Sequence, residues 1–284
     1  MQVTHSVAEA VEAVRALRSG GKSLGFVPTM GALHTGHLSL VRAAMEENDR
    51  VVVSIFVNPT QFGPDEDYEE YPRQLDNDVA TCTKEKVDLL FAPRTSEMYP
   101  AGYATYVLQE RYTEPFEGEI RTGHFHGVCT VCAKLFNIVR PDRAYFGHKD
   151  YQQCAVIRRM IRDLNFEIET RVCPTVRESD GLAMSSRNAL LSPELRAEAT
   201  CLYSALQRAQ EMFDAGQRST APLLAAMEEI IQEAPHAKLD YVAVVNPESL
   251  REIRRIESEA VVLVAARFNG TRLLDNIRLS VDSA

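Results

Sequence analysis

The 284-residue sequence contains no apolar run long enough to cross a membrane and no excess of basic residues. Its mean hydropathy is −0.20, and no stretch approaches the ~18 consecutive apolar residues of a membrane helix. The first residues, MQVTHSVAEAVEAVRAL, show neither a basic start nor a continuous apolar core, so we expect no secretory signal there. The sequence therefore predicts a protein with no membrane partner.

Charge excludes a second class of partner. The chain has 31 basic and 40 acidic residues, for a formal net charge of −9. A protein that binds along a nucleic-acid backbone normally presents a basic face. We therefore expect no nucleic-acid partner, although a small phosphorylated ligand needs only a few local donors.

The placement of the cysteines argues against disulfides. The six cysteines lie mostly in apolar segments, and a chain of this length needs no covalent staples. We expect free thiols and a cytoplasmic location. The alternative is a zinc site, since His124 and His126 precede Cys129 and Cys132. Four ligands within nine residues are cramped, so we favour buried core thiols and predict no metal site built by the protein.

The first part of the chain alternates apolar segments with helical patterns. Strands are expected at 23–28, 50–58, 87–93, 143–147 and 167–174. One helix should end near Asn48, and three more are expected at 75–86, 128–139 and 150–164. This rhythm predicts an α/β fold with a Rossmann-like, doubly wound parallel sheet, in which ligands bind beyond the carboxyl ends of the strands.

The pattern changes after about residue 175. Ser192 and Pro193 begin a predicted helix whose apolar stripe continues to Phe213 and which should stop at Gly216. A second helix is expected over 220–234, followed by strands at 239–246, 260–268 and 271–279, the last two joined by a hairpin turn at Asn269-Gly270. We predict two domains: residues 1–175, and a smaller C-terminal α+β domain, residues 176–284.

The segment from Pro28 to His37, PTMGALHTGH, carries the clearest chemical signal. Gly31 and Gly36 allow the backbone to approach a ligand closely, and the N-terminus of the following helix is a natural phosphate seat. His34 and His37 lie three residues apart and can project from the same side of the first turn. The pattern indicates a nucleotide-phosphate site; the alternative is a pair of surface or capping histidines.

Three further segments follow in order: NPTQF (58–62), YFGHKDYQQ (145–153) and GLAMSSRN (181–188). The segment PTMGALHTGH (28–37) resembles the HxGH motif of the nucleotidylyltransferase superfamily. All four together resemble the pantothenate synthetase, or pantoate–β-alanine ligase, family. The resemblance implies an enzyme, specifically a ligase that forms an amide bond.

The resemblance also implies the reaction. The carboxylate of pantoate attacks the α-phosphate of ATP, which gives pantoyl adenylate and pyrophosphate. The amine of β-alanine then displaces AMP and forms pantothenate. Such chemistry requires mainly alignment and neutralisation of phosphate charge, with Mg²⁺ carried on the ATP phosphates. The family further implies a homodimer. A two-domain adenylating enzyme would gain by excluding water, so we expect the C-terminal domain to act as a lid over the nucleotide.

The resemblance assigns roles residue by residue. It gives catalysis to His34, His37, Lys149 and Arg187. It gives pantoate binding to Gln61 and Gln153, with Asn58 as a weaker partner and Gln61 also near β-alanine. It gives nucleotide binding to Met30, Gly31, Ala32, Leu33, His34, Thr35, Gly36, His37, Gly147, His148, Lys149, Asp150, Val176, Met184, Ser185, Ser186 and Arg187. His148 departs from the family, which commonly has Glu or Gln there, so we give it no catalytic role.

Other interpretations stay open at this point. Residues 147–150 could form an exposed turn with a salt bridge, and residues 185–187 could cap a helix. At the level of function, the alternatives are an HxGH adenylyltransferase acting on another acceptor and a non-catalytic nucleotide-binding protein.

Overall fold

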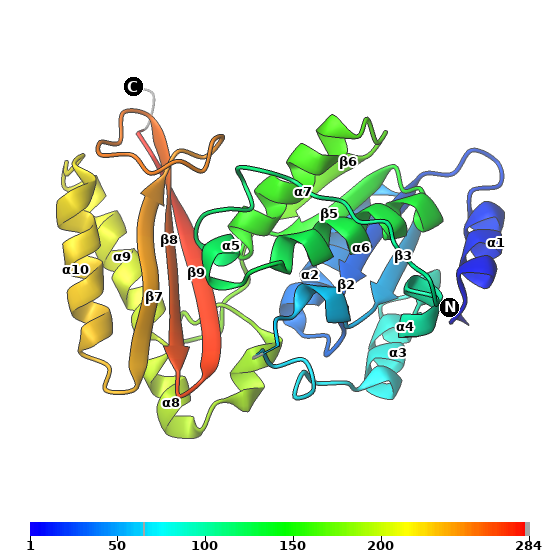
Figure 1. The fold of residues 1–284 in the computed structure, drawn as a ribbon, viewed down its shortest axis with the longest axis horizontal. Coiled ribbons are helices and arrows are strands. Elements are labelled where there is room, and N and C mark those ends of the chain that lie inside the picture. The colour runs from blue at the N-terminus through cyan, green and yellow to red at the C-terminus, as the bar shows by residue number, and fades with distance from the viewer. Residues whose placement is uncertain (65, 282–284) are drawn as a thin grey trace. The chain divides into compact units, whose positions relative to one another are not determined.

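The computed structural model describes residues 1–64 and 66–281, which form two compact units (Figure 1). The first unit is Met1–His148 with Gln152–Pro174. The second is Lys149–Tyr151 with the chain from Thr175 onward. No helix in the described residues is both long and apolar enough to span a membrane.

A six-stranded parallel sheet forms the centre of the first unit. Its strands lie in the order β1-β4-β3-β2-β5-β6. Their bounds are β1 Gln2–Thr4, β2 Leu24–Thr29, β3 Arg50–Ile55, β4 Leu89–Phe91, β5 Arg143–Gly147 and β6 Glu169–Cys173. Every pairing between them is parallel. Strand β3 is apolar without alternation because side chains on both of its faces are buried.

Helices cover both faces of this sheet. On one face, α1 (Val7–Leu17), α6 (His124–Val139) and α7 (Tyr151–Asp163) pack around Phe26 and Phe136. On the other face, α2 (Thr35–Glu47) and α3 (Leu75–Lys84) pack around Val27 and Tyr145. Two short helices, α4 (Thr95–Met98) and α5 (Glu117–Ile120), lie in the long connection before α6. The predicted doubly wound sheet is confirmed.

Some predicted bounds were wrong. The apolar run at 50–58 leaves the sheet after Ile55, because Asn58 instead caps the 3₁₀ turn η1 (Pro59–Gln61) and accepts the Thr60 N–H at 3.3 Å. Sequence reasoning also missed β1 and α1. Helix α1 had a readable signal, because Ser6 and Glu9 form a reciprocal capping box at its start.

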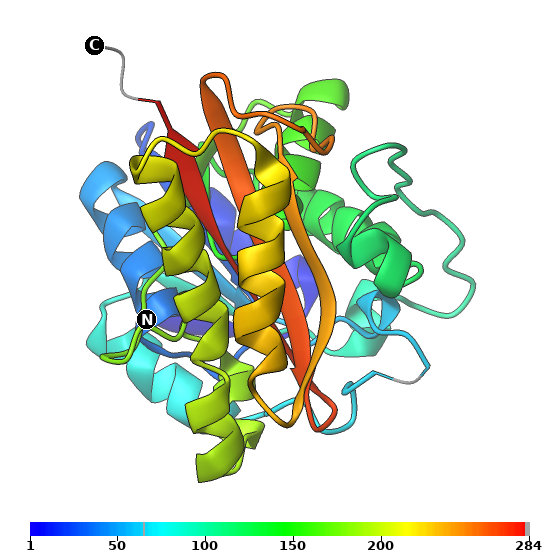
Figure 2. The ribbon, with the colours of Figure 1, turned by 90° about the vertical axis from the view of Figure 1, so that its left-hand side faces the viewer.

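The second unit is built on a three-stranded antiparallel sheet, β7 (Ala237–Val245), β8 (Glu259–Phe268) and β9 (Thr271–Ser280). The predicted hairpin between β8 and β9 is confirmed, and both of its turn residues have positive φ, 46° at Asn269 and 97° at Gly270. Helices α9 (Cys201–Asp214) and α10 (Thr220–Gln232) cover one face of the sheet (Figure 2).

The single helix predicted from Ser192 to Phe213 is in fact two, α8 (Pro193–Glu198) and α9. Ser192 caps α8 as expected, since its Oγ accepts the Leu195 N–H at 3.3 Å. The hydroxyl of Thr200 donates to the carbonyl of Ala197 at 2.7 Å, which competes with the helical ladder at the break. The apolar stripe nevertheless faces one core, because Leu202, Leu206 and Phe213 are all buried there.

Candidate active site

The loop between β2 and α2 is held in place by a buried carboxylate. Asp78 of α3 accepts the N–H groups of Ala32 at 2.9 Å and Leu33 at 2.8 Å. Gly31 has a φ of +86°, and a Cβ there would lie 2.9 Å from Ile55 Cγ2 and 3.0 Å from Asp78 Oδ2. Only glycine fits such a position without strain. Burial raises the pKa of Asp78, and its hydrogen bonds to the two N–H groups oppose that effect.

His34 and His37 form a reciprocal cap at the start of α2. Nδ1 of His34 accepts the Gly36 N–H at 3.1 Å, and Nδ1 of His37 accepts the His34 N–H at 3.3 Å. The two ring centroids lie 4.1 Å apart. Because both Nδ1 atoms are acceptors, each neutral ring carries its proton on Nε2. The capping interpretation is therefore correct, and it is compatible with two Nε2–H donors at a helix N-terminus.

Asn58 and Gln61 occupy the turn that follows β3, and both are buried. Nδ2 of Asn58 donates to Gln61 Oε1 and to the carbonyl of Gly127, each at 3.1 Å. Its Oδ1 accepts the Tyr99 hydroxyl at 2.8 Å. The buried side chain of Asn58 therefore stabilises the turn through these hydrogen bonds. The amide Nε2 of Gln61 lies 3.1 Å from Met30 Sδ, so this side chain reaches the β2–α2 loop.

Two neighbouring glutamines of α7 differ in their surroundings. Gln152 is buried, and its amide nitrogen donates to the carbonyls of Tyr112 and Pro115, both at 2.8 Å. Its role is structural. Gln153, the predicted pantoate ligand, is only half-buried. Ahead of α7, Gly147 ends β5, and the His148 N–H donates to the carbonyl of Cys173 at 2.8 Å.

Lys149 and Asp150 belong to the second unit, which the sequence did not indicate. Lys149 Nζ lies 3.4 Å from Asp150 Oδ1, so the expected salt bridge is present. The main chain of Lys149 is tied to β9, because Asn276 Nδ2 donates to its carbonyl at 2.8 Å. Sequence reasoning missed Asn276.

The segment from Val176 to Arg187 folds back on itself within the second unit. The Met184 N–H donates to the Val176 carbonyl at 2.9 Å, and Ser185 Oγ accepts the Arg187 N–H at 3.2 Å. Ser185 therefore caps the 3₁₀ helix η2 (Ser186–Leu190), as the capping interpretation predicted. At Gly181 (φ +92°), an added Cβ would lie 2.0 Å from the Tyr203 ring.

The predicted site residues thus divide between the two units. The loop residues Met30–His37, with Asn58, Gln61, Gly147, His148 and Gln153, lie in the first. Lys149, Asp150, Val176 and Met184–Arg187 lie in the second.

The residues of the alternative histidine–cysteine zinc site have other surroundings in the structure. Nδ1 of His124 lies 2.8 Å from the Gln61 carbonyl. Cys129 and Cys132 are buried in α6, and burial raises the pKa of the Cys129 thiol to about 12 and that of Cys132 further. The prediction that these cysteines are core thiols is confirmed.

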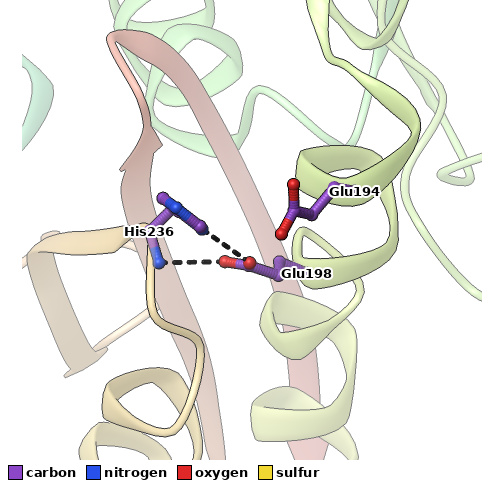
Figure 3. A group of neighbouring side chains, drawn as sticks. All are labelled: Glu194, Glu198 and His236. Carbon is purple, nitrogen blue, oxygen red and sulfur yellow. Dashed lines mark hydrogen bonds and ion pairs between the residues drawn. The ribbon is translucent and has the colours of Figure 1, made fainter.

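Elsewhere in the described residues, Glu194, Glu198 and His236 of the second unit lie close enough together to hold an ion (Figure 3). His236 donates from Nδ1 at 2.8 Å and from its backbone at 3.0 Å to Glu198. Hydrogen bonding to that carboxylate raises the pKa of His236. An ion pair accounts for this arrangement.

Comparisons with known proteins show which family this chain resembles. The family described as Pantoate-beta-alanine ligase matches residues 2–278. The pantothenate synthetase of Moorella thermoacetica is 51% identical over 282 residues, covering 99% of this chain and 100% of the relative. That of Chloroflexus aggregans is 53% identical over 277 residues, covering 97% and 99%.

Similar solved structures come from the same family. The pantothenate synthetase from Thermus thermophilus superposes with a TM-score of 0.93 at 51% identity, covering 98% of this chain and 99% of that one. The pantoate-beta-alanine ligase from Francisella tularensis, complexed with beta-gamma ATP and beta-alanine, gives 0.81 at 33% identity and covers 98% and 97%. The chain therefore belongs to the pantoate–β-alanine ligase family.

Proposed function

We propose that this protein joins pantoate and β-alanine into pantothenate through a pantoyl-adenylate intermediate, with ATP converted to AMP and pyrophosphate. The family match over nearly the whole chain supports the ligation. The observation that carries the adenylate route is the reciprocal cap of His34 and His37, in which each Nδ1 accepts a backbone N–H and each neutral ring therefore carries an Nε2–H donor at a helix N-terminus.

In the first step, a pantoate carboxylate oxygen forms a bond to the α-phosphorus of ATP, and the bond from that phosphorus to the β-phosphate bridging oxygen breaks. The carboxylate is already a nucleophile, so the step requires alignment and charge neutralisation. We assign the pantoate contacts to Gln61 and Gln153. His34 and His37 would donate to the phosphate oxygens, and Lys149 and Arg187 would neutralise the pyrophosphate that departs.

In the second step, the neutral amine of β-alanine attacks the acyl carbon of the adenylate, AMP leaves with the bonding electron pair, and the amine loses a proton. Gln61 is placed in this proposal beside the incoming amine. Mg²⁺ would arrive on the ATP phosphates. The structure of the Francisella tularensis ligase is described as complexed with beta-gamma ATP and beta-alanine, which supports ATP and β-alanine as substrates here.

The resemblance to the family also leads us to propose a cytoplasmic homodimer. In this proposal, residues 176–284 close over the bound nucleotide, since a site that forms an adenylate benefits from excluding water.

Isotope exchange between ATP and pyrophosphate tests the proposed function. We expect exchange that requires pantoate and proceeds without β-alanine, and AMP release once β-alanine is added. Exchange that ignores pantoate would indicate an adenylyltransferase for another acceptor. ATP binding without any turnover would favour a non-catalytic nucleotide-binding protein.

A further inference from the structure

The turn that carries Gln61 packs against the first turn of α6, and His124 makes the central contact between them. This side chain is 8% exposed. Its Nδ1 lies 2.8 Å from the Gln61 carbonyl, and its Nε2 lies 3.0 Å from Nη1 of Arg121. A carbonyl only accepts and a guanidinium only donates. The ring is therefore neutral, with its proton on Nδ1 directed at Gln61.

Arg121 is itself held in place, and this fixes the tautomer of His124. Its guanidinium makes two hydrogen bonds to the carboxylate of Glu66, at 2.8 and 2.7 Å. An oxygen of the Glu117 carboxylate lies 4.0 Å from Nη1 of Arg121. The Arg121 side chain is only 11% exposed, so these charge-assisted bonds operate away from bulk water.

Gly127 brings the helix close enough for this contact. A Cβ at Gly127 would lie 2.4 Å from the Thr60 carbonyl oxygen and 2.5 Å from the Gln61 nitrogen, so backbone packs against backbone. Asn58 also connects the turn to the helix, because its Nδ2 donates both to the Gly127 carbonyl and to Gln61 Oε1.

Gln61 is therefore fixed at both ends. Its carbonyl is held by His124, and its side-chain amide lies between Asn58 and Met30 of the β2–α2 loop. We propose that His124 is a positioning residue: by holding the Gln61 backbone, it keeps the Gln61 amide set for the pantoate carboxylate and hydroxyls. The inference rests on the proposed function, in which Gln61 binds pantoate.

Replacing His124 by either of two amides separates this role from simple packing. Asparagine can present its N–H near the position of Nδ1, whereas glutamine reaches the position of Nε2. We expect His124→Leu to raise the KM for pantoate in the exchange assay about 10- to 100-fold, as loss of a buried hydrogen bond would. The KM for ATP should stay within about two-fold. His124→Asn should recover most of the loss, and His124→Gln should not.

Several outcomes would overturn the inference: equal increases in KM for ATP and pantoate, no change in either, or equal behaviour of the asparagine and glutamine variants. The two amide variants keep the test decisive should His124→Leu fail to fold. Absence of pantoate-dependent exchange in the unaltered protein is a different result, because it would overturn the proposed function and this inference with it.

Discussion

His34 and His37 each use one ring nitrogen to shape the backbone and the other for the chemistry we propose. Both Nδ1 atoms cap the start of α2, at 3.1 and 3.3 Å from the N–H groups they accept. Substitutions at His37 can therefore separate the two roles. An asparagine side chain can imitate the Nδ1 acceptor, while a glutamine side chain can imitate the Nε2–H donor.

At this residue we predict that His37→Ala lowers the rate of pantoate-dependent exchange by roughly 10²–10³, the usual effect of losing one preorganised transition-state donor. ATP affinity, measured by calorimetry, should change much less. His37→Gln should retain more exchange than His37→Asn. An unchanged exchange rate in His37→Ala would remove His37 from the catalytic assignment.

His124 also makes stability depend on pH. Burial, aided by the nearby charge of Arg121, lowers its pKa to about 4, while Glu66 and Glu117 oppose the shift. The unfolded chain, with a histidine pKa of ~6.5, binds more protons between these two values. This contribution to stability is therefore complete above pH ~6.5 and is lost as the pH falls toward 4, for a total of up to ~3 kcal/mol.

Urea unfolding at pH 7 and pH 4.5 measures this contribution. We expect the free energy of unfolding to fall more steeply with acidification in the unaltered protein than in His124→Asn, which has no imidazole to protonate. Other groups that titrate in this range are common to both proteins and cancel in the comparison. Equal pH dependence in the two would show that the buried histidine is not the source.

At the level of elements, the sequence pattern predicted a strand whose residues are buried on both faces but missed a break between two helices. Strand β5 was predicted at 143–147 and spans those residues, because burial on both faces leaves a continuous apolar run. The split between α8 and α9 was missed because the apolar stripe continues across it. At the break, the N–H groups of Thr200 and Leu202 donate to carbonyls three residues back, each at 3.3 Å, and apolar periodicity does not reveal this change.

The same limit applies to the site. Residues within the four motifs could be proposed as site residues from the sequence because their spacing is short. The positions of Asp78, His124 and Glu66 in the structure could not be predicted, because the contacts that define them are made with residues 45 to 63 positions away along the chain. Each acts by holding another residue, so no short pattern surrounds it.

Strand β9 supplies a prediction of its own, since its Asn276 holds the main chain of Lys149. Replacing Asn276 by leucine keeps much of the volume and removes the donor. We expect the kcat of exchange to fall about 10-fold, with the KM for pantoate unchanged. Arg278→Gln is the matched control, because this exposed residue of the same strand pairs with Glu259. A rise in the KM for pantoate in Asn276→Leu would contradict this assignment.

For the molecule as a whole, both proposed pantoate ligands lie in one unit, whereas the proposed nucleotide-binding residues divide between the two units. Each unit has its own hydrophobic core. The proposed pantoate ligands Gln61 and Gln153 belong to the first, and Lys149 and Arg187 to the second. Pantoate binding without ATP should therefore depend on the first unit alone.

Calorimetric titration with pantoate tests this division. We predict that Arg187→Ala binds pantoate within about two-fold of the unaltered protein while losing roughly 10²–10³ of the exchange rate. Gln61→Ala should lose most of its pantoate affinity. Loss of pantoate affinity in Arg187→Ala would show that the second unit takes part in that site.

Chelation tests where the divalent ion resides. Among the described residues, Glu194, Glu198 and His236 lie close together, and Glu198 and His236 already pair with each other, so we expect Mg²⁺ to enter with the nucleotide. EDTA should abolish exchange, and added Mg²⁺ should restore it. The Tm of the nucleotide-free protein should not change with EDTA, whereas the rise in Tm caused by ATP should shrink, since tight ATP binding is what stabilises the folded state. Glu198→Gln should leave the Mg²⁺ dependence of exchange unaltered. A fall in the Tm of the nucleotide-free protein on chelation would instead reveal an ion held by the chain itself.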